Sequence, residues 1–260
     1  MEHVLEIENV SKFFHGLVAI DDLTIKVKPG QIYGIIGPNG AGKTTLFNCV
    51  TGIYVPEKGT IKYKGKDITG MEPHKIAQMG VLRTFQNIRL FKEMSVAENI
   101  MAGYHTKSKQ KWYHSIFHTP FYKKDELESW KKVEELMKFF KLSKYATTPT
   151  GDLSYGNQRK VEMARALAAN PELLILDEPA AGLNENETKE LTEIIRDISK
   201  MDIGIMMIEH DMEMVMSLTD YITVINFGKE ISQGEPSFVQ DDPRVIEAYI
   251  GTDDEDEEEQ

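Results

Sequence analysis

Residues 37–44 read Gly-Pro-Asn-Gly-Ala-Gly-Lys-Thr and match the pattern GxxxxGK[ST] at every fixed position. An apolar strand is predicted directly before them, and a helix is predicted over 45–50. In this setting the glycines let backbone N–H groups surround a phosphate, and the start of the helix adds partial positive charge at the same place. We expect Lys43 to reach the β- and γ-phosphates of a nucleotide and the Thr44 hydroxyl to bind Mg²⁺.

A second motif joins an apolar strand to two carboxylates, and residues 173–179 read Leu-Leu-Ile-Leu-Asp-Glu-Pro. A buried parallel strand would deliver Asp177 and Glu178 to the sheet edge that also carries the phosphate-binding loop. There Asp177 can hold Mg²⁺ through water, and Glu178 can take a proton from the attacking water. Together the two motifs predict phosphoryl transfer from a nucleoside triphosphate.

Composition narrows the class of protein. Acidic residues outnumber basic ones by 42 to 30, and the net charge of −12 would repel a nucleic-acid backbone, so we expect no nucleic-acid partner. A single cysteine, Cys49, excludes an intramolecular disulfide and fits a buried packing role in a reducing compartment. The apolar runs are too short to span a bilayer, and the first residues lack a secretory signal. We therefore expect a cytoplasmic protein that reaches a membrane through a partner.

The order of predicted elements indicates an α/β fold. Strands are predicted over 5–10, 23–27, 31–36 and 59–63, and apolar spacings of three and four between 94 and 145 predict inserted amphipathic helices. From residue 158 onward, helices alternate with strands over 173–176, 203–208 and 221–225. This alternation predicts a parallel sheet covered by helices.

Residues 153–159 read Leu-Ser-Tyr-Gly-Asn-Gln-Arg and stand at a predicted helix start. They resemble the LSGGQ signature of the ATP-binding cassette family, whose members drive ABC transporters. Ser154 and the backbone of Gly156 would form an anion site there, which in that family completes the ATP site of the opposite subunit. The resemblance covers about 5–251 and implies a P-loop NTPase core with a mostly parallel sheet, an N-terminal antiparallel β region and a helical insertion.

Three further positions match the family. Gln86 corresponds to the Q-loop glutamine, which contacts metal and attacking water, and His210 corresponds to the switch histidine, which contacts the γ-phosphate. Phe14 corresponds to the aromatic residue that stacks on adenine, and Phe13 is the competing choice because alternation does not say which ring faces the base.

The resemblance thus implies a complete set of site residues for ATP and Mg²⁺. Catalytic roles fall to Glu178, His210 and Gln86, and the metal ligands are Thr44, Gln86 and Asp177. The ATP-binding residues are Phe14, Gly37, Asn39, Gly40, Ala41, Gly42, Lys43, Thr44, Thr45, Ser154 and Gly156.

Residues 1–252 are predicted to form a single nucleotide-binding domain. Its ATPase core would comprise 1–87 and 158–252, and its helical subdomain would comprise 88–157. Seven of the 42 acidic residues lie at 253–259, so we expect 253–260 to form a disordered acidic tail.

The motif details at 39–45, 83–86 and 179–184 are similar to the LivG-type subunits of branched-chain amino-acid importers. Tyr155, Asn157 and Asn184 depart from the general family consensus, and the tyrosine and Asn184 recur in that subfamily. The resemblance implies membrane-spanning permease subunits, a second ABC ATPase subunit that is a related chain or a second copy, and indirectly a substrate-binding protein. It implies a position on the inner face of the cell membrane.

Two segments compete as the surface that contacts the permease. One is 86–94, and the other is an aromatic cluster between 111 and 124 that contains Trp112, Tyr113, Phe117, Phe121 and Tyr122. Other functions also stay open: a soluble cassette ATPase without a transport role, a nucleotide-binding regulator, or a motor for another solute. A single phosphate-binding loop and a short insertion disfavour the first, and Glu178 with His210 disfavours the second.

Overall fold

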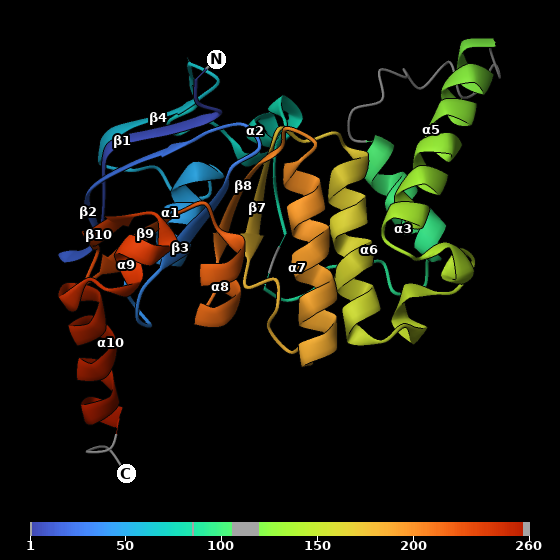
Figure 1. The fold of residues 1–260 in the computed structure, drawn as a ribbon. Coiled ribbons are helices and arrows are strands. Elements are labelled where there is room, and N and C mark those ends of the chain that lie inside the picture. The colour runs from blue at the N-terminus through green and yellow to red at the C-terminus, as the bar shows by residue number, and fades with distance from the viewer. Residues whose placement is uncertain (1, 85, 106–119, 257–260) are drawn as a thin grey trace. The chain divides into compact units, whose positions relative to one another are not determined.

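The structure is a computed structural model that describes residues 2–84, 86–105 and 120–256 (Figure 1). It separates into two compact units. The sheet unit comprises Met1–Arg83, Glu172–Ala181 and Thr192–Gln260, and the helical unit comprises Thr84–Pro171 and Gly182–Leu191. Both predicted motifs around residues 37–44 and 173–178 therefore belong to the sheet unit.

The first sheet is antiparallel, with strand order β2-β1-β4-β5. Its strands are β1 (Leu5–Phe14), β2 (Leu17–Val27), β4 (Lys58–Tyr63) and β5 (Lys66–Asp67). His15 and Gly16 join β1 to β2 with φ of 46° and 94°, the left-handed conformations that suit a two-residue hairpin. The predicted antiparallel β region is confirmed, and β1 extends far enough for Phe14 to be its last residue.

The second sheet has strand order β10-β9-β3-β8-β7-β6. Its strands are β3 (Ile32–Ile36), β6 (Val81–Arg83), β7 (Leu173–Asp177), β8 (Gly204–Ile208), β9 (Tyr221–Asn226) and β10 (Lys229–Gly234). Every neighbouring pair is parallel except β10 with β9. All residues of β3, β7 and β8 are buried, which is why these strands read as continuous apolar runs. The predicted mostly parallel sheet is confirmed.

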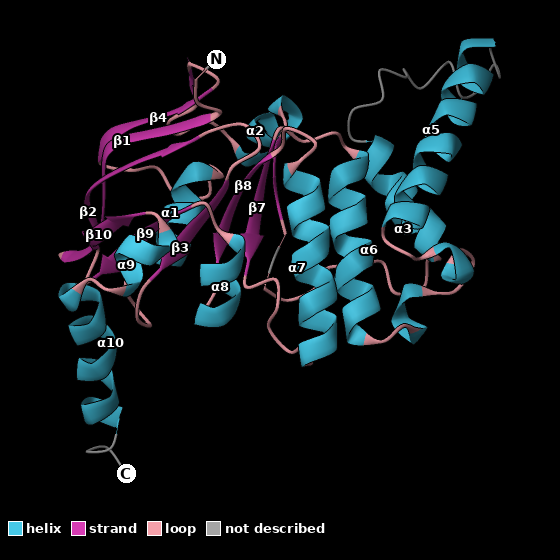
Figure 2. Ribbon diagram, in the orientation of Figure 1, coloured by secondary structure: helices cyan, strands magenta, loops and turns pink. Residues whose placement is uncertain are grey.

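Helices cover both faces of this sheet (Figure 2). They are α1 (Lys43–Val50), α2 (Pro73–Met79), α8 (Met212–Leu218), α9 (Pro236–Gln240) and α10 (Pro243–Asp256). Ile35 packs in the core that contains Leu46 of α1, whereas Ile36 packs with Val215 of α8, because successive side chains of a strand point to opposite faces. Cys49 is buried in the first of these cores, and burial raises the pKa of its thiol to about 12.

Helix α10 includes the beginning of the acidic run for which the sequence predicts disorder. It continues to Asp256, and no proline or glycine interrupts residues 252–256. Residues 257–260 lie outside the described part of the chain.

The helical unit contains α3 (Val96–His105), α5 (Pro120–Phe139) and α6 (Tyr155–Ala168), with two 3-10 turns at Ser143–Tyr145 and Thr150–Asp152. Helix α7 (Glu185–Ser199) begins in this unit and ends in the sheet unit. Helix α6 packs tightly on α3 in this unit: a Cβ on Gly103 would lie 2.0 Å from the Arg165 carbonyl oxygen. No helix among the described residues has the length and apolar character needed to cross a membrane.

Candidate active site

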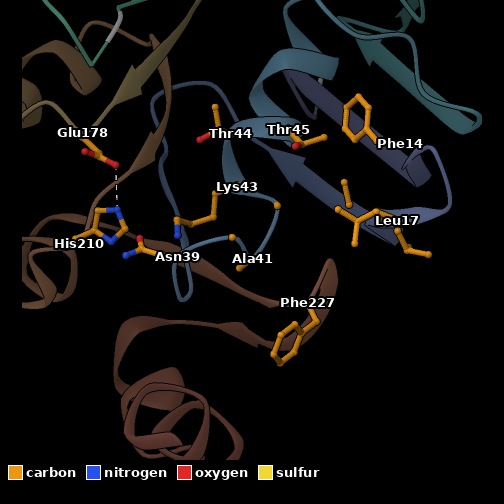
Figure 3. A pocket seen from close by; sticks show the side chains of 14 residues that line it. Phe14, Leu17, Asn39, Ala41, Lys43, Thr44, Thr45, Glu178, His210 and Phe227 are labelled. Carbon is orange, nitrogen blue, oxygen red and sulfur yellow. Dashed lines mark hydrogen bonds and ion pairs between the residues drawn. The ribbon is translucent and has the colours of Figure 1, made fainter. Parts of the chain in front are cut away.

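The phosphate-binding loop connects the end of β3 to the start of α1 (Figure 3). Gly37 has a φ of +146°, and a Cβ there would lie 1.9 Å from the Ile225 carbonyl oxygen. Gly42 has a φ of +106°, and a Cβ there would lie 2.3 Å from the Ala19 carbonyl oxygen. Both the backbone conformation and the close neighbouring strands therefore demand glycine at these two positions.

The start of α1 supplies an anion-binding environment. The N–H of Leu46 donates to the Gly42 carbonyl at 3.0 Å, so the N–H groups of residues 43–45 precede the helical ladder. The Lys43 side chain is buried, and its Nζ donates to the carbonyl oxygens of Gly37 at 2.6 Å and Pro38 at 2.8 Å. Burial lowers the pKa of Lys43, while the charge of Glu178 acts in the opposite direction. The ammonium is thus held in place across the loop.

A cavity of about 500 Å³ opens over this loop. Its lining residues are Phe14, Leu17, Val18, Ala19, Asn39, Gly40, Ala41, Gly42, Lys43, Thr44, Thr45, Glu178, His210 and Phe227. The structure therefore brings most of the residues predicted for ATP binding together with two predicted catalytic residues. Sequence reasoning missed Leu17, Val18 and Phe227, whose exposed fractions are 69%, 43% and 83%. Their only signal in the sequence is an apolar side chain beside a turn.

Phe14, the first choice for stacking on a base, contributes its ring to the cavity (Figure 3). The ring packs edge-on against Tyr54 with centroids 5.1 Å apart, and Lys12 Nζ lies 5.0 Å from its centroid. The ring of Phe13 instead lies beside Lys58 Nζ, at 5.8 Å. This geometry favours Phe14 over Phe13 for the base.

The carboxylates of the second motif stand at the end of β7 in different environments. Asp177 is buried, and its Oδ2 accepts a hydrogen bond from Arg83 at 2.6 Å. Arg83 also donates to Asn48 Oδ1 on α1 at 2.7 Å, so it ties the Asp177 carboxylate to the helix that follows the loop. Glu178 has a φ of 46°, a strained left-handed conformation of the kind found at active sites, and its N–H donates to the Ile208 carbonyl at 3.0 Å.

Glu178 and His210 form a pair inside the cavity, with Oε1 and Nε2 2.9 Å apart (Figure 3). Glu209, which the sequence reading did not single out, connects the two loops that carry this pair. It is buried and accepts hydrogen bonds from the N–H groups of Ala180 at 2.6 Å and His210 at 3.1 Å. Burial raises the pKa of Glu209. These bonds fix the relative position of the proposed base and the histidine.

The oxygen donors near the loop suit a magnesium ion. Mg²⁺ prefers hydroxyl, carboxylate and phosphate oxygens, and Thr44 and Asp177 provide the first two. Thr44 is exposed at the cavity, and Arg83 holds the Asp177 carboxylate in one orientation. The chemistry of these residues therefore fits the metal.

Gln86, Ser154 and Gly156 belong to the helical unit. Ser154 is the N-cap of α6, and its Oγ accepts the N–H of Asn157 at 3.4 Å. A Cβ on Gly156 would lie 2.5 Å from Glu187 Oε1, so the glycine lets these segments approach. The roles of these three residues toward ATP stay predictions.

Comparison with known proteins gives consistent matches along the chain. Residues 20–181 match the family described as ABC transporter, and 229–255 match that described as branched-chain amino acid ATP-binding cassette transporter. The chain is 43% identical to the high-affinity branched-chain amino acid transport ATP-binding protein BraF of Pseudomonas aeruginosa, over 95% of this chain and 98% of the relative. It is 40% identical to the corresponding protein LivG of Escherichia coli (strain K12), with the same coverage.

Solved structures agree with these relatives. A nucleotide-free ATP-binding cassette from an ABC transporter superposes with a TM-score of 0.82 at 33% identity, covering 95% of this chain and 98% of the other. The ADP conformation of an ATP-binding cassette of an ABC transporter gives the same score and identity, with 96% and 100% covered.

The fold and the loop define a P-loop ATPase that carries an added antiparallel sheet. The chain belongs to the ABC transporter family and is an ATP-binding cassette related to branched-chain amino acid transport ATP-binding proteins. The resemblance inferred from the sequence is confirmed. ATP hydrolysis coupled to transport is characteristic of this family.

Proposed function

We propose that this chain is the ATP-hydrolysing subunit of an importer of branched-chain amino acids. The observation that carries the catalytic part is that Lys43 and the Glu178–His210 pair line the same cavity. The solute is supported by the names of BraF and LivG and by the match over 229–255.

Binding of ATP follows from the cavity. The N–H groups of the loop and the Lys43 ammonium would hold the phosphates, and the Phe14 ring would stack on the base. Thr44, Asp177 and Gln86 would hold Mg²⁺, which neutralises phosphate charge when it is bound.

Hydrolysis requires a group that accepts a proton from water. Glu178 would take this proton as the water oxygen forms a bond to the γ-phosphorus and the bond to the bridging oxygen of ADP breaks. His210 would orient the Glu178 carboxylate through the 2.9 Å contact and then reach the γ-phosphate.

A second cassette completes the proposed assembly. Ser154 and Gly156 would cover the ATP held by that partner, which is a related chain or a second copy. Closure of the pair around ATP would move membrane-spanning permease subunits, and hydrolysis would reopen it. The subunit would thus be peripheral on the inner face of the membrane, and a substrate-binding protein would act on the permease from the other side.

The segment 86–94 is the proposed permease contact, because Phe91 is 53% exposed within it. In the competing cluster, Trp112, Tyr113 and Phe117 lie outside the described residues, and Phe121 and Tyr122 lie on α5.

Capture of the closed state tests the proposed assembly. Tagged Glu178→Gln should retain membrane partners when it is purified from native membranes with MgATP, because bound ATP cannot be hydrolysed to reopen the pair. Mass spectrometry should identify polytopic membrane subunits and a cassette, and parallel purification with ADP should lose them. Recovery of soluble proteins alone would instead favour a cassette ATPase without a transport role.

A further inference from the structure

Arg159 is the largest of the fully buried side chains in the described part of the protein. It lies on α6, five residues after the N-cap residue Ser154, and its exposed fraction is 0%. Removing a guanidinium from water is unfavourable unless charged and polar partners surround it, and an apolar side chain of similar volume would avoid that penalty. Its partners therefore indicate what the charge does there.

These partners lie on two segments of the helical unit, α6 itself and the segment that begins at Gln86. One terminal nitrogen contacts Glu162 Oε2 at 3.0 Å, and the other donates to the Gln86 carbonyl oxygen at 2.9 Å. The second nitrogen also lies 3.4 Å from the Tyr155 hydroxyl, and the guanidinium lies 5.8 Å from the centre of that ring. One side chain thus joins α6, the signature tyrosine and the backbone of the predicted Q-loop.

The contact continues along α6 through residues at spacings of three. Glu162 Oε1 accepts the N–H of Arg89 at 3.3 Å. Arg165 donates to the Arg89 carbonyl oxygen, and its guanidinium lies 5.8 Å from the centre of the Phe91 ring. We call Arg159, Glu162 and Arg165 the α6 clasp. It holds the main chain from Gln86 to Arg89 and the ring of exposed Phe91 against one face of the helix.

Tyr155, which Arg159 contacts, extends these contacts to the segment that follows the second motif. The Tyr155 ring comes within 3.3 Å of the position that a Cβ on Gly182 would occupy. Glu187 approaches Gly156 in the same way, at 2.5 Å from the corresponding Cβ position. The contacts are therefore continuous from Phe91, through the signature, to Gly182.

We propose that Arg159 is a positioning residue that transmits displacement of the segment 86–94 to the signature residues Ser154 and Gly156. The proposal rests on the function proposed above, which gives these two segments their roles. A lysine at this position keeps the charge but loses the planar fork that reaches Glu162 and the Gln86 carbonyl together. Arg159→Lys should therefore loosen the connection without removing a group that contacts nucleotide.

The test uses the complete transporter in proteoliposomes, with solute uptake and ATP hydrolysis measured on the same samples. Arg159→Lys should lower the amount of solute moved per ATP by about fivefold, the size of effect expected from a coupling residue. ATP affinity of the isolated subunit should stay within about twofold of wild type, because the contacts of Arg159 described above lie within the helical unit, whereas the residues that line the cavity belong to the sheet unit.

Lys160→Met is the matched control. Lys160 is the next residue on α6, and its substitution removes an ion pair with Glu190 of α7, at 2.5 Å, but leaves the α6 clasp intact. It should lower the melting temperature while leaving solute moved per ATP unchanged. An Arg159→Lys ratio equal to wild type, or reduced no further than in Lys160→Met, would show that the clasp only stabilises the fold.

A second variant and a second readout test the proposed role of Arg159 if the first experiment fails. If Arg159→Lys does not fold, Glu162→Gln weakens the same clasp at Arg159 and is judged by the same ratio. If wild type moves no branched-chain amino acid, the proposed solute is wrong, and the clasp is judged by how strongly the membrane subunits stimulate ATP hydrolysis. If the membrane subunits stimulate ATP hydrolysis by Arg159→Lys as strongly as by wild type, the proposed role of Arg159 is overturned.

Discussion

Glu178→Gln should abolish ATP turnover while ATP still binds. The amide nearly matches the carboxylate in shape and can still accept a hydrogen bond from His210, but it cannot take a proton from water. General-base catalysis contributes about 10²- to 10⁴-fold, so kcat should fall by about 10²-fold or more. Phosphate release at saturating MgATP measures the turnover, and a calorimetric titration measures the binding.

Glu172→Gln is the matched control for this change. Glu172 immediately precedes the same strand, β7, and pairs with Lys64 at 2.5 Å at a half-exposed position. Neutralising it removes the same charge without touching the cavity, so turnover should stay near wild type. Near-normal turnover in Glu178→Gln would instead assign the proton transfer to another group.

Lys43→Ala should weaken MgATP binding more than any other single change at the loop. The ammonium is buried over the loop, where a charge-assisted hydrogen bond to phosphate contributes about 1.5–3 kcal/mol. The dissociation constant should therefore rise by about 10- to 100-fold in a calorimetric titration.

Loss of the Lys43 ammonium should weaken ATP binding because its contact with phosphate is lost, and not because the net charge of the protein changes. Lys229→Ala is the control for net charge. Lys229 pairs with Asp21 on the surface at 3.4 Å, and its substitution removes an equal positive charge two residues from Phe227, which lines the cavity. Its ATP affinity should be close to wild type. Equal losses in the two variants, or unchanged affinity in Lys43→Ala, would contradict a phosphate-binding role for Lys43.

The residues that the sequence could place are those whose chemistry is local. Residues 37–44 form their loop because glycine at positions 37 and 42 permits the required φ values. The flanking strand and helix are formed by the residues directly before and after the loop. The position of Glu178 beside that loop could be predicted from the sequence, because the carboxyl ends of parallel strands lie at one edge of the sheet.

The residues that the sequence missed act across long separations. Arg83 reaches Asp177 over 94 positions, and Glu209 reaches Ala180 over 29. Phe227 enters the cavity because the Gly228 N–H that follows it donates to the Ala41 carbonyl, at 3.0 Å, which sets the hairpin beside the loop. No local periodicity encodes these contacts, because they depend on how the strands are ordered in the sheet.

The α6 clasp shows the same limit in the helical unit. Arg159 reads in the sequence as one more charged residue after the signature, and its complete burial follows only from the way α6 packs on the segment that begins at Gln86. The helical periodicity predicts α5, but it does not predict that Leu127 and Trp130 stay 58% and 46% exposed while Val133 and Phe140 are buried.

The central claim is that ATP hydrolysis by this chain drives uptake of branched-chain amino acids. Uptake of radiolabelled leucine should be measured in cells that lack the chain and carry either wild type or Glu178→Gln. The account predicts that wild type restores ATP-dependent uptake and that the variant, produced at the same level, does not. Equal uptake with and without the chain, or full restoration by Glu178→Gln, would contradict it.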